Sequence, residues 1–271
     1  QPWQYMAIRF DITDRKRVEE ELKAKHAELE ARAEALARSN AELEQFAYVA
    51  SHDLQEPLRM VSLYTQLLAK RYQGKLDPDA DDFIRYASEG AQTMVGMIRD
   101  LLTYARLGAA APNARPVSVD ASLDGALLNL RAALDDAQPT LQRGPLPQVP
   151  GDLSQYTQLF QNLVGNALKF RAAGRPLHLE IGAEKDAGCW RFWVKDNGIG
   201  FNREQAERIF TLFQRLHARN AFPGNGIGLA FCKRIVERHG GRIELESRPG
   251  EGTTFRISLP LRPPDAGHPS M

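Results

Sequence analysis

Four leucines recur at every seventh position in a stretch that contains neither proline nor glycine: Leu22, Leu29, Leu36 and Leu43. Residues 14–45 consist mostly of Ala, Glu, Leu, Lys and Arg, which favour helices. Such a heptad predicts a long helix that pairs with a second copy as a coiled coil, so we expect a homodimer. The other core positions of the heptad carry polar or small residues, which predicts a weak interface between the two helices of the coiled coil. A solvated spacer helix is the alternative.

A single histidine follows this stretch, in the sequence FAYVASHDLQEP of residues 46–57. His52 precedes Asp53, so an imidazole and a carboxylate are neighbours in a predicted helix. Pro57 is expected to end or kink that helix, because proline lacks the backbone N–H and clashes with the preceding turn. A histidine of this kind is a candidate acceptor of a transferred group in catalysis. The alternative is a surface histidine without a catalytic role.

Helical periodicity resumes after Pro57 and stops near Gly74, where residues 74–79 have turn chemistry. A second helix is predicted over residues 79–107, with apolar side chains on more than one face. Two helices joined by a short turn form a hairpin, and two hairpins from a dimer would bury the surplus apolar surface as a four-helix bundle.

The rest of the chain alternates helical and strand patterns, which predicts an α/β domain after a linker at residues 108–116. Predicted strands cover residues 117–119, 177–183, 190–195, 242–247 and 253–259. Predicted helices cover residues 122–134, 151–170, 203–210 and 227–238, and the tail 263–271 is expected to be disordered.

Three polar and glycine-rich blocks stand in this second half: QNLVGNALKF at 161–170, DNGIG at 196–200 and GNGIGL at 224–229. Asn162 and Asn166 are one helical turn apart and share a face, which suits two amides that converge on a ligand. The glycines allow the backbone to approach a ligand where a Cβ would collide. A tight turn is the alternative interpretation of the second block.

With His52, these blocks resemble the ordered sequence boxes of two-component sensor histidine kinases, over residues from about 40 to 260. The resemblance implies a coiled-coil linker and an antiparallel helical hairpin in a dimeric four-helix bundle, followed by an α/β sandwich of the Bergerat ATP-binding fold. Residues 1–13 are similar to the last strand and Asp-Ile-Thr exit of a PAS sensor domain, which implies an upstream sensor.

The resemblance implies a reaction: His52 takes a phosphoryl group from ATP and passes it to an aspartate in the receiver domain of a response regulator. Asp53 is expected to orient the imidazole and to raise its basicity. Many of these kinases also dephosphorylate the regulator, with Thr or Asn four residues after the histidine. Here Glu56 occupies that position, so we expect weak phosphatase activity or dependence on other residues. The alternative is that Glu56 acts as a base for the attacking water.

The resemblance also assigns the residues that bind ATP. Asn166 is expected to hold Mg²⁺, Asn162 to help position it, and Lys169 to reach phosphate oxygens. Asp196 would accept a hydrogen bond from the adenine amino group. The other expected nucleotide-binding residues are Gly198, Gly200, Gly224, Gly226, Gly228 and Thr253.

Two further features belong to the same family pattern. Phe210 and Phe213 match an aromatic box, and they are equally well interpreted as core residues. Residues 215–223 are expected to be a mobile lid over ATP, with Gly224 as its hinge.

Two rival functions share parts of this pattern. An ATP hydrolase of the gyrase- or MutL-like kind uses the same fold but usually carries Glu, as general base, where this chain has Asn162. A non-catalytic dimeric scaffold with a vestigial pocket is the other rival. The predicted domains are a sensor remnant at 1–13, a signalling coiled coil at 14–45, a phosphotransfer hairpin at 46–107, a linker at 108–116, an ATP-binding domain at 117–262 and a tail at 263–271.

Charge and composition limit the partners. A formal net charge of +1 gives no field that attracts nucleic acid or an anionic membrane. No apolar run reaches the ~20 residues needed to span a bilayer, so we expect a cytoplasmic fragment without membrane contact. Cys189 and Cys232 lack metal-ligand spacing and are expected to be buried small hydrophobes.

Overall fold

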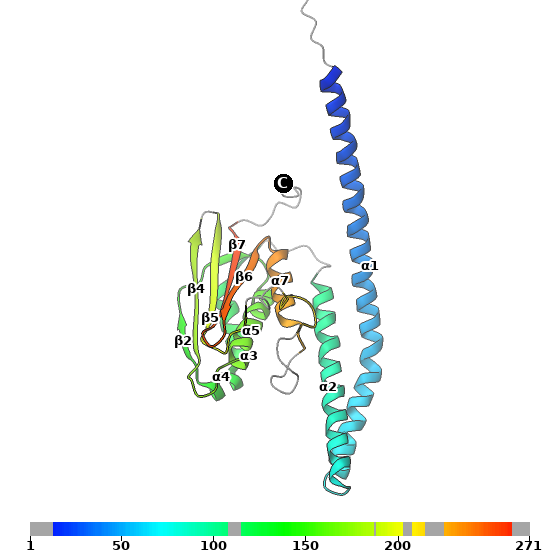
Figure 1. The fold of residues 1–271 in the computed structure, drawn as a ribbon, viewed down its shortest axis with the longest axis vertical. Coiled ribbons are helices and arrows are strands. Elements are labelled where there is room, and N and C mark those ends of the chain that lie inside the picture. The colour runs from blue at the N-terminus through cyan, green and yellow to red at the C-terminus, as the bar shows by residue number, and fades with distance from the viewer. Residues whose placement is uncertain (1–12, 108–114, 187, 203–207, 215–224, 262–271) are drawn as a thin grey trace, which may run out of the picture.

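The computed structural model describes residues 13–107, 115–186, 188–202, 208–214 and 225–261 (Figure 1). The chain begins with two antiparallel helices, α1 (Thr13–Tyr72) and α2 (Pro78–Arg106). Asp77 caps α2, because its Oδ1 accepts a hydrogen bond from the backbone N–H of Ala80 at 2.7 Å. The predicted hairpin and its turn are thus where the sequence indicated.

Pro57 was expected to end or kink the first helix, and the first of these two alternatives is wrong. α1 continues without a break through Pro57 to Tyr72. Proline removes one backbone hydrogen bond and adds one clash. This half of α1 packs against α2, and Figure 1 shows the two helices side by side here. We attribute the continuity of α1 across Pro57 to this packing.

The first half of α1 extends beyond the hairpin in Figure 1 and carries the heptad leucines. Leu22, Leu29 and Leu36 are 67%, 66% and 72% exposed. Ion pairs one turn apart, such as Lys23 with Glu19 at 2.9 Å, add a few tenths of a kcal/mol each at most. Within the single chain, the leucine stripe therefore lies against solvent. Among the described residues, no helix has the length and apolar character that crossing a bilayer requires.

The second half of the chain is built on a five-stranded sheet in the order β2-β4-β5-β7-β6, in which only the β2–β4 pair is parallel. A two-stranded antiparallel sheet, β1 with β3, accompanies it. The strands are β1 (Pro116–Ser118), β2 (Thr140–Arg143), β3 (Gln148–Pro150), β4 (His178–Asp186), β5 (Cys189–Asp196), β6 (Arg242–Arg248) and β7 (Gly252–Pro260).

Helices cover one face of this sheet (Figure 1) and bury a common apolar core with it. They are α3 (Val119–Asn129), α4 (Arg131–Ala137), α5 (Leu153–Lys169) and α7 (Gly228–Arg238). Leu123, Leu163 and Ile235 are completely or almost completely buried there, beside sheet residues such as Leu179 and Ile257. A helical region followed by an α/β domain is the fold class that the sequence predicted, and it is confirmed.

Several local expectations were wrong. The helix predicted over residues 122–134 is two helices that meet at Leu130, and the segment between it and the helix predicted from residue 151 contains β2 and β3. Cys232 is buried as expected, and burial raises the pKa of its thiol. Cys189 is the first residue of β5 and is only partly buried.

Other expectations lie wholly or partly outside the described residues. These are the strand and sensor remnant up to residue 12, the linker at 108–114, the first part of the helix at 203–210, the lid with Gly224, and the tail from residue 262. The described part of that helix, Arg208 to Phe210, is a turn.

Candidate functional site

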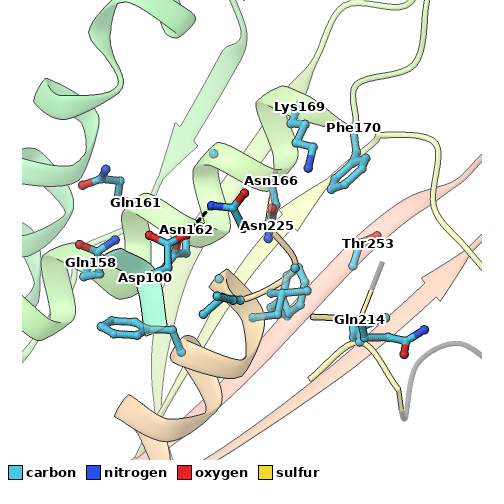
Figure 2. A pocket seen from close by; sticks show the side chains of 18 of the residues that line it. Asp100, Gln158, Gln161, Asn162, Asn166, Lys169, Phe170, Gln214, Asn225 and Thr253 are labelled. Carbon is cyan, nitrogen blue, oxygen red and sulfur yellow. Dashed lines mark hydrogen bonds between the residues drawn. The ribbon is translucent and has the colours of Figure 1, made fainter. Parts of the chain in front are cut away.

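A cavity of about 530 Å³ lies where α5, α7, and the ends of β5 and β7 meet the second helix of the hairpin (Figure 2). Its lining includes eight of the residues that the sequence assigned to nucleotide binding. These are Asn162, Asn166, Lys169, Asp196, Gly200, Gly226, Gly228 and Thr253. The structure thus gathers side chains that lie up to 91 positions apart in the sequence into one site.

Helix α5 supplies the two amides and the lysine. Asp152 caps its start, with Oδ1 accepting backbone hydrogen bonds from Ser154 at 2.8 Å and Gln155 at 3.1 Å. The hydrogen bonds that Asp152 accepts, first that from the Ser154 side chain, lower the pKa of its carboxyl group. Apolar residues bury one face of α5, so the partly exposed face carries Asn162, Asn166 and Lys169.

The lysine is held at the C-terminal end of this face. Its Nζ lies 4.5 Å from the centroid of the Phe170 ring, a cation–π distance. A cation on this wall of the cavity suits an anionic ligand, and Figure 2 shows the Lys169 and Phe170 side chains next to each other.

Asp196 ends β5 and is buried, with 9% of its surface exposed. Its Oδ1 accepts a hydrogen bond from the backbone N–H of Gly198 at 2.8 Å. Burial raises the pKa of this carboxyl, while backbone N–H groups of Gly198 and Thr253 oppose the rise. Thr253 is its partner across β5 and β7, and the Thr253 hydroxyl is 3.0 Å from that of Ser247.

The glycines that follow Asp196 serve contacts within the protein itself. A Cβ on Gly198 would lie 2.6 Å from the carbonyl oxygen of Phe170. Gly200 has φ +59°, and a Cβ there would lie 1.9 Å from the carbonyl oxygen of Arg248. Gly198 is buried and is not among the cavity-lining residues. Both glycines therefore allow backbone segments to pack closely behind Asp196.

The third block begins α7 against the amides of α5. Gly226 has φ +71°, a conformation that favours glycine. A Cβ on Gly228 would lie 3.1 Å from Oδ1 of Asn162, so this glycine lets the start of α7 approach that amide. The first glycine of the block, Gly224, lies outside the described residues.

One wall of the cavity was not foreseen. Arg99, Asp100 and Thr103 of α2 line it, and Asp100 Oδ2 accepts a hydrogen bond from Asn225 Nδ2 at 2.9 Å (Figure 2). Nothing near Asp100 in the sequence indicates a ligand, because its partner is 125 positions away. Only the docking of α2 on the α/β domain brings the two together.

The helix that carries the predicted acceptor does not contribute to the described lining of the cavity. His52 lies within α1, its side chain being outside the described part, and Asp53 is exposed on the same helix. None of the cavity-lining residues that the structure describes belongs to α1. The acceptor helix and the cavity are therefore separate in this arrangement.

The two aromatic-box residues differ from each other. Phe210 packs against the apolar core. Phe213 is 51% exposed and has φ +62°, which is unusual for an aromatic residue. Core packing accounts for Phe210 but not for Phe213.

Comparison with known families now adds to this geometry. Residues 42–110 match the family described as the His Kinase A (phospho-acceptor) domain. Residues 151–263 match the family described as histidine kinase-, DNA gyrase B- and HSP90-like ATPase.

Curated relatives extend over nearly the whole chain. Cyanobacterial phytochrome A of Nostoc sp. is 46% identical over 260 residues, which are 96% of this chain and 34% of that protein. The phytochrome-like protein Cph1 of Synechocystis sp. is 43% identical over 260 residues, 96% of this chain and 35% of that protein. The chain thus spans about a third of the length of these relatives.

Solved structures share the fold. Full-length ShkA in complex with AMPPNP has a TM-score of 0.60 and 26% identity, covering 81% of this chain and 46% of that one. The Acinetobacter baumannii histidine kinase AdeS has a TM-score of 0.53 at 22% identity, covering 78% of this chain and 98% of that one. The second likeness concerns the fold alone.

Proposed function

The chain carries the phosphoacceptor and ATPase domains of the histidine kinases, and we propose that it phosphorylates His52 from ATP and passes the phosphoryl group to a response regulator. The observation that carries this proposal is the cavity, which joins two amides, a lysine and a buried carboxylate in a chain that also bears the acceptor histidine.

ATP would bind with its adenine at Asp196 and Thr253. The buried carboxylate offers an acceptor to the adenine amino group, and Thr253 stands beside it on β7. The phosphates would extend toward Asn162, Asn166 and Lys169 on α5. The nucleotide in the ShkA structure, AMPPNP, is an ATP analogue and agrees with a triphosphate ligand.

Mg²⁺ fits the same wall of the cavity. Asn166, with Asn162 one turn before it, offers amide oxygens of the kind that this hard cation binds along with phosphate oxygens and water. Among the described residues, no cluster of three or more His, Cys, Asp or Glu side chains could hold a metal alone. The cation when bound would neutralise charge on the phosphates. Because the amides provide few of its ligands, Asn166 would hold it together with the phosphate oxygens of the nucleotide.

At His52, a ring nitrogen would attack the γ-phosphorus, the bond to the β,γ-bridging oxygen would break, and ADP would leave. The nitrogen must be unprotonated to attack, and Asp53 would accept a hydrogen bond from the other ring N–H. In this proposal the α/β domain moves toward α1 for this step, and the described lining of the cavity includes no residue of α1. Transfer to an aspartate of the receiver domain would then regenerate the histidine.

A homodimer is part of the proposal. Leu22, Leu29 and Leu36 on the first half of α1 are exposed in the single chain, and the hairpin leaves apolar residues such as Leu67 and Phe83 exposed as well. A coiled coil followed by a four-helix bundle would bury both sets. The receiver domain would be a second, transient partner.

We also propose where the protein acts and how it receives its signal. An upstream sensor domain agrees with the PAS-like residues 1–13 and with the third of the relatives' length that the chain spans. A sensor joined through α1 could bias the register of the coiled coil and so transmit a signal. We place this assembly in the cytoplasm.

The test is incubation of the protein with ATP labelled on the γ-phosphate and with Mg²⁺, followed by acid and alkali treatment. A phosphohistidine loses its label in acid and keeps it in alkali. Label that survives acid, or release of free phosphate without labelled protein, would instead support an ATP hydrolase or another acceptor.

A further inference from the structure

One face of α2 rests on the α/β domain beside the cavity. Gly96, Asp100 and Tyr104 follow each other at intervals of four residues and so share this face. A Cβ on Gly96 would lie 3.1 Å from Nδ2 of Asn225, and the Tyr104 ring is 5.9 Å from the Arg234 guanidinium carbon. Asn225 therefore lies against the glycine, with its amide donating to Asp100.

Asp100 stands at the part of the cavity where the phosphates of a nucleotide are expected. Its partner Asn225 belongs to the glycine-rich loop, three residues before Gly228, where an added Cβ would lie 3.1 Å from Oδ1 of Asn162. Asp100 and Asn162 also line the same cavity, and Figure 2 shows Asp100 bonded to Asn225 in front of the amides of α5. A carboxylate is thus held close to the expected triphosphate.

We propose that Asp100 acts as an electrostatic gate, so that docking of α2 on the α/β domain and binding of a nucleoside triphosphate oppose each other. The proposal rests on the proposed function, that is, on ATP binding in this cavity. The negative carboxylate is fixed by Asn225, and negative phosphates brought next to it raise the free energy of the docked state. Because such coupling is reciprocal, bound triphosphate would weaken the docking of α2 by the same factor.

The proposed opposition between docking and binding comes from electrostatic repulsion rather than from steric overlap. Among the described lining residues, Arg99 and Lys169 are the cations, and Asp100 and Asp196 are the carboxylates. Asp196 lies at the strand end assigned to adenine, which leaves Asp100 as the carboxylate facing the phosphates. Arg99 is exposed, whereas the Asp100 carboxylate is fixed in place by its bond to Asn225.

The experiment compares nucleotide affinities of the wild type and Asp100→Asn by calorimetry in the presence of Mg²⁺. Asparagine keeps an oxygen that can accept the bond from Asn225, so the substitution removes the charge and retains the contact. We expect affinity for ATP to rise roughly threefold or more, affinity for ADP to rise less, and affinity for adenosine to stay unchanged. The gain should shrink in high salt, because ions screen partly exposed charges.

Asp82→Asn is the matched control. It removes one carboxylate from the same helix, about 27 Å away along its axis at 1.5 Å per residue, and Asp82 is exposed and paired with Arg85. Its ATP affinity should equal that of the wild type. Arg99→Gln removes a cation beside Asp100 and should lower ATP affinity.

The outcomes separate the gate from the function on which it rests. Failure of the wild type to bind ATP would overturn both. Binding by the wild type with unchanged affinity in Asp100→Asn would overturn the gate alone. Lower affinity in Asp100→Asn would overturn it too, since the carboxylate would then help to bind the cation or the ligand. An equal gain for adenosine would show loosened packing in place of charge repulsion.

Discussion

Asp196 and Gly198 are joined by a hydrogen bond of 2.8 Å from the glycine N–H to Oδ1 of the buried carboxylate. This bond fixes the orientation of the Asp196 side chain at the cavity. The backbone of the same turn is secured by Phe170, whose carbonyl oxygen accepts from Ile199 N–H at 3.0 Å. A carboxylate held in this way is an acceptor with a set direction, which is what selective binding of an amino group requires.

Asp196→Asn should therefore weaken ATP binding. The asparagine oxygen can still accept from Gly198, which turns the NH₂ group toward the adenine amino group and leaves a donor unpaired. The expected loss is about 1–3 kcal/mol of binding free energy, measured by calorimetry with ATP and Mg²⁺. Asp135→Asn, an exposed change on α4, is the control. Unchanged affinity in Asp196→Asn would reduce Asp196 to a turn residue.

His52→Ala should abolish acid-labile labelling and leave ATP affinity nearly unchanged, because no described residue of α1 lines the cavity. Autoradiography after acid and alkali treatment measures the first effect, and calorimetry the second. The control is His26→Ala, which removes an exposed imidazole of the same helix that lies 3.2 Å from Glu30. Full labelling of His52→Ala would reject His52 as the acceptor.

Glu56 bears on dephosphorylation of the regulator. It is exposed, lies one turn after His52, and forms an ion pair with Arg59 at 3.2 Å. A carboxylate only accepts hydrogen bonds and repels the phosphoryl-aspartate, so we expect slow dephosphorylation by the wild type and faster dephosphorylation by Glu56→Thr. The assay mixes phosphorylated regulator with the protein and ADP. Rapid dephosphorylation by the wild type that disappears in Glu56→Ala would show that Glu56 promotes the reaction.

Gly200→Ala should destabilise the α/β domain strongly. The added Cβ would lie 1.9 Å from the Arg248 carbonyl oxygen, in a backbone region that already disfavours alanine. Gly174→Ala is the matched control, because Gly174 has φ +74° but no atom within 4 Å of an added Cβ. The control should cost roughly 1–2 kcal/mol of unfolding free energy in urea titrations, and Gly200→Ala clearly more. Equal losses would mean that the loop moves aside freely.

His239 should make stability depend on pH. The side chain is 5% exposed, its Nδ1 is 2.8 Å from the Ile235 carbonyl oxygen, and its Nε2 is buried with no hydrogen-bond partner among the described residues. Burial lowers the pKa of His239 from its ordinary value of 6.5. The unfolded chain therefore binds a proton more readily than the folded one, so stability is full above about pH 6.5 and falls below it.

Urea titrations from pH 8 to pH 5 test this, with a slope of up to about 1.4 kcal/mol per pH unit for one proton. His239→Gln should remove the contribution of His239 to this slope, while Asp196, whose pKa burial raises, contributes a pH dependence of the opposite sign. Asp152, the nearby carboxylate with a lowered pKa, contributes stability that is lost only below its ordinary value of 3.8, so it does not interfere. A pH-independent wild type would contradict the prediction.

Local pattern was sufficient where neighbours along the chain determine the conformation. Helical periodicity on both sides of the turn at residues 74–79 predicted the hairpin, and alternation predicted β4, β5, β6 and β7 within a few residues. β2 and β3 were missed because they are short, and each is held by a strand distant in sequence. The helix does not end at Pro57, because the local rule for proline takes no account of the packing of α1 on α2.

The sequence by itself determined the residue types of the site: the spacing of Asn162 and Asn166 on one helical face, and the acid and glycines at 196–200. The tertiary structure alone decided what those residues contact. Gly200 is required by the Arg248 carbonyl, and Asp100 joins the cavity through Asn225, two positions 125 residues apart. Helical and strand periodicity act over a few residues, whereas such contacts depend on how whole domains dock, which no local pattern encodes.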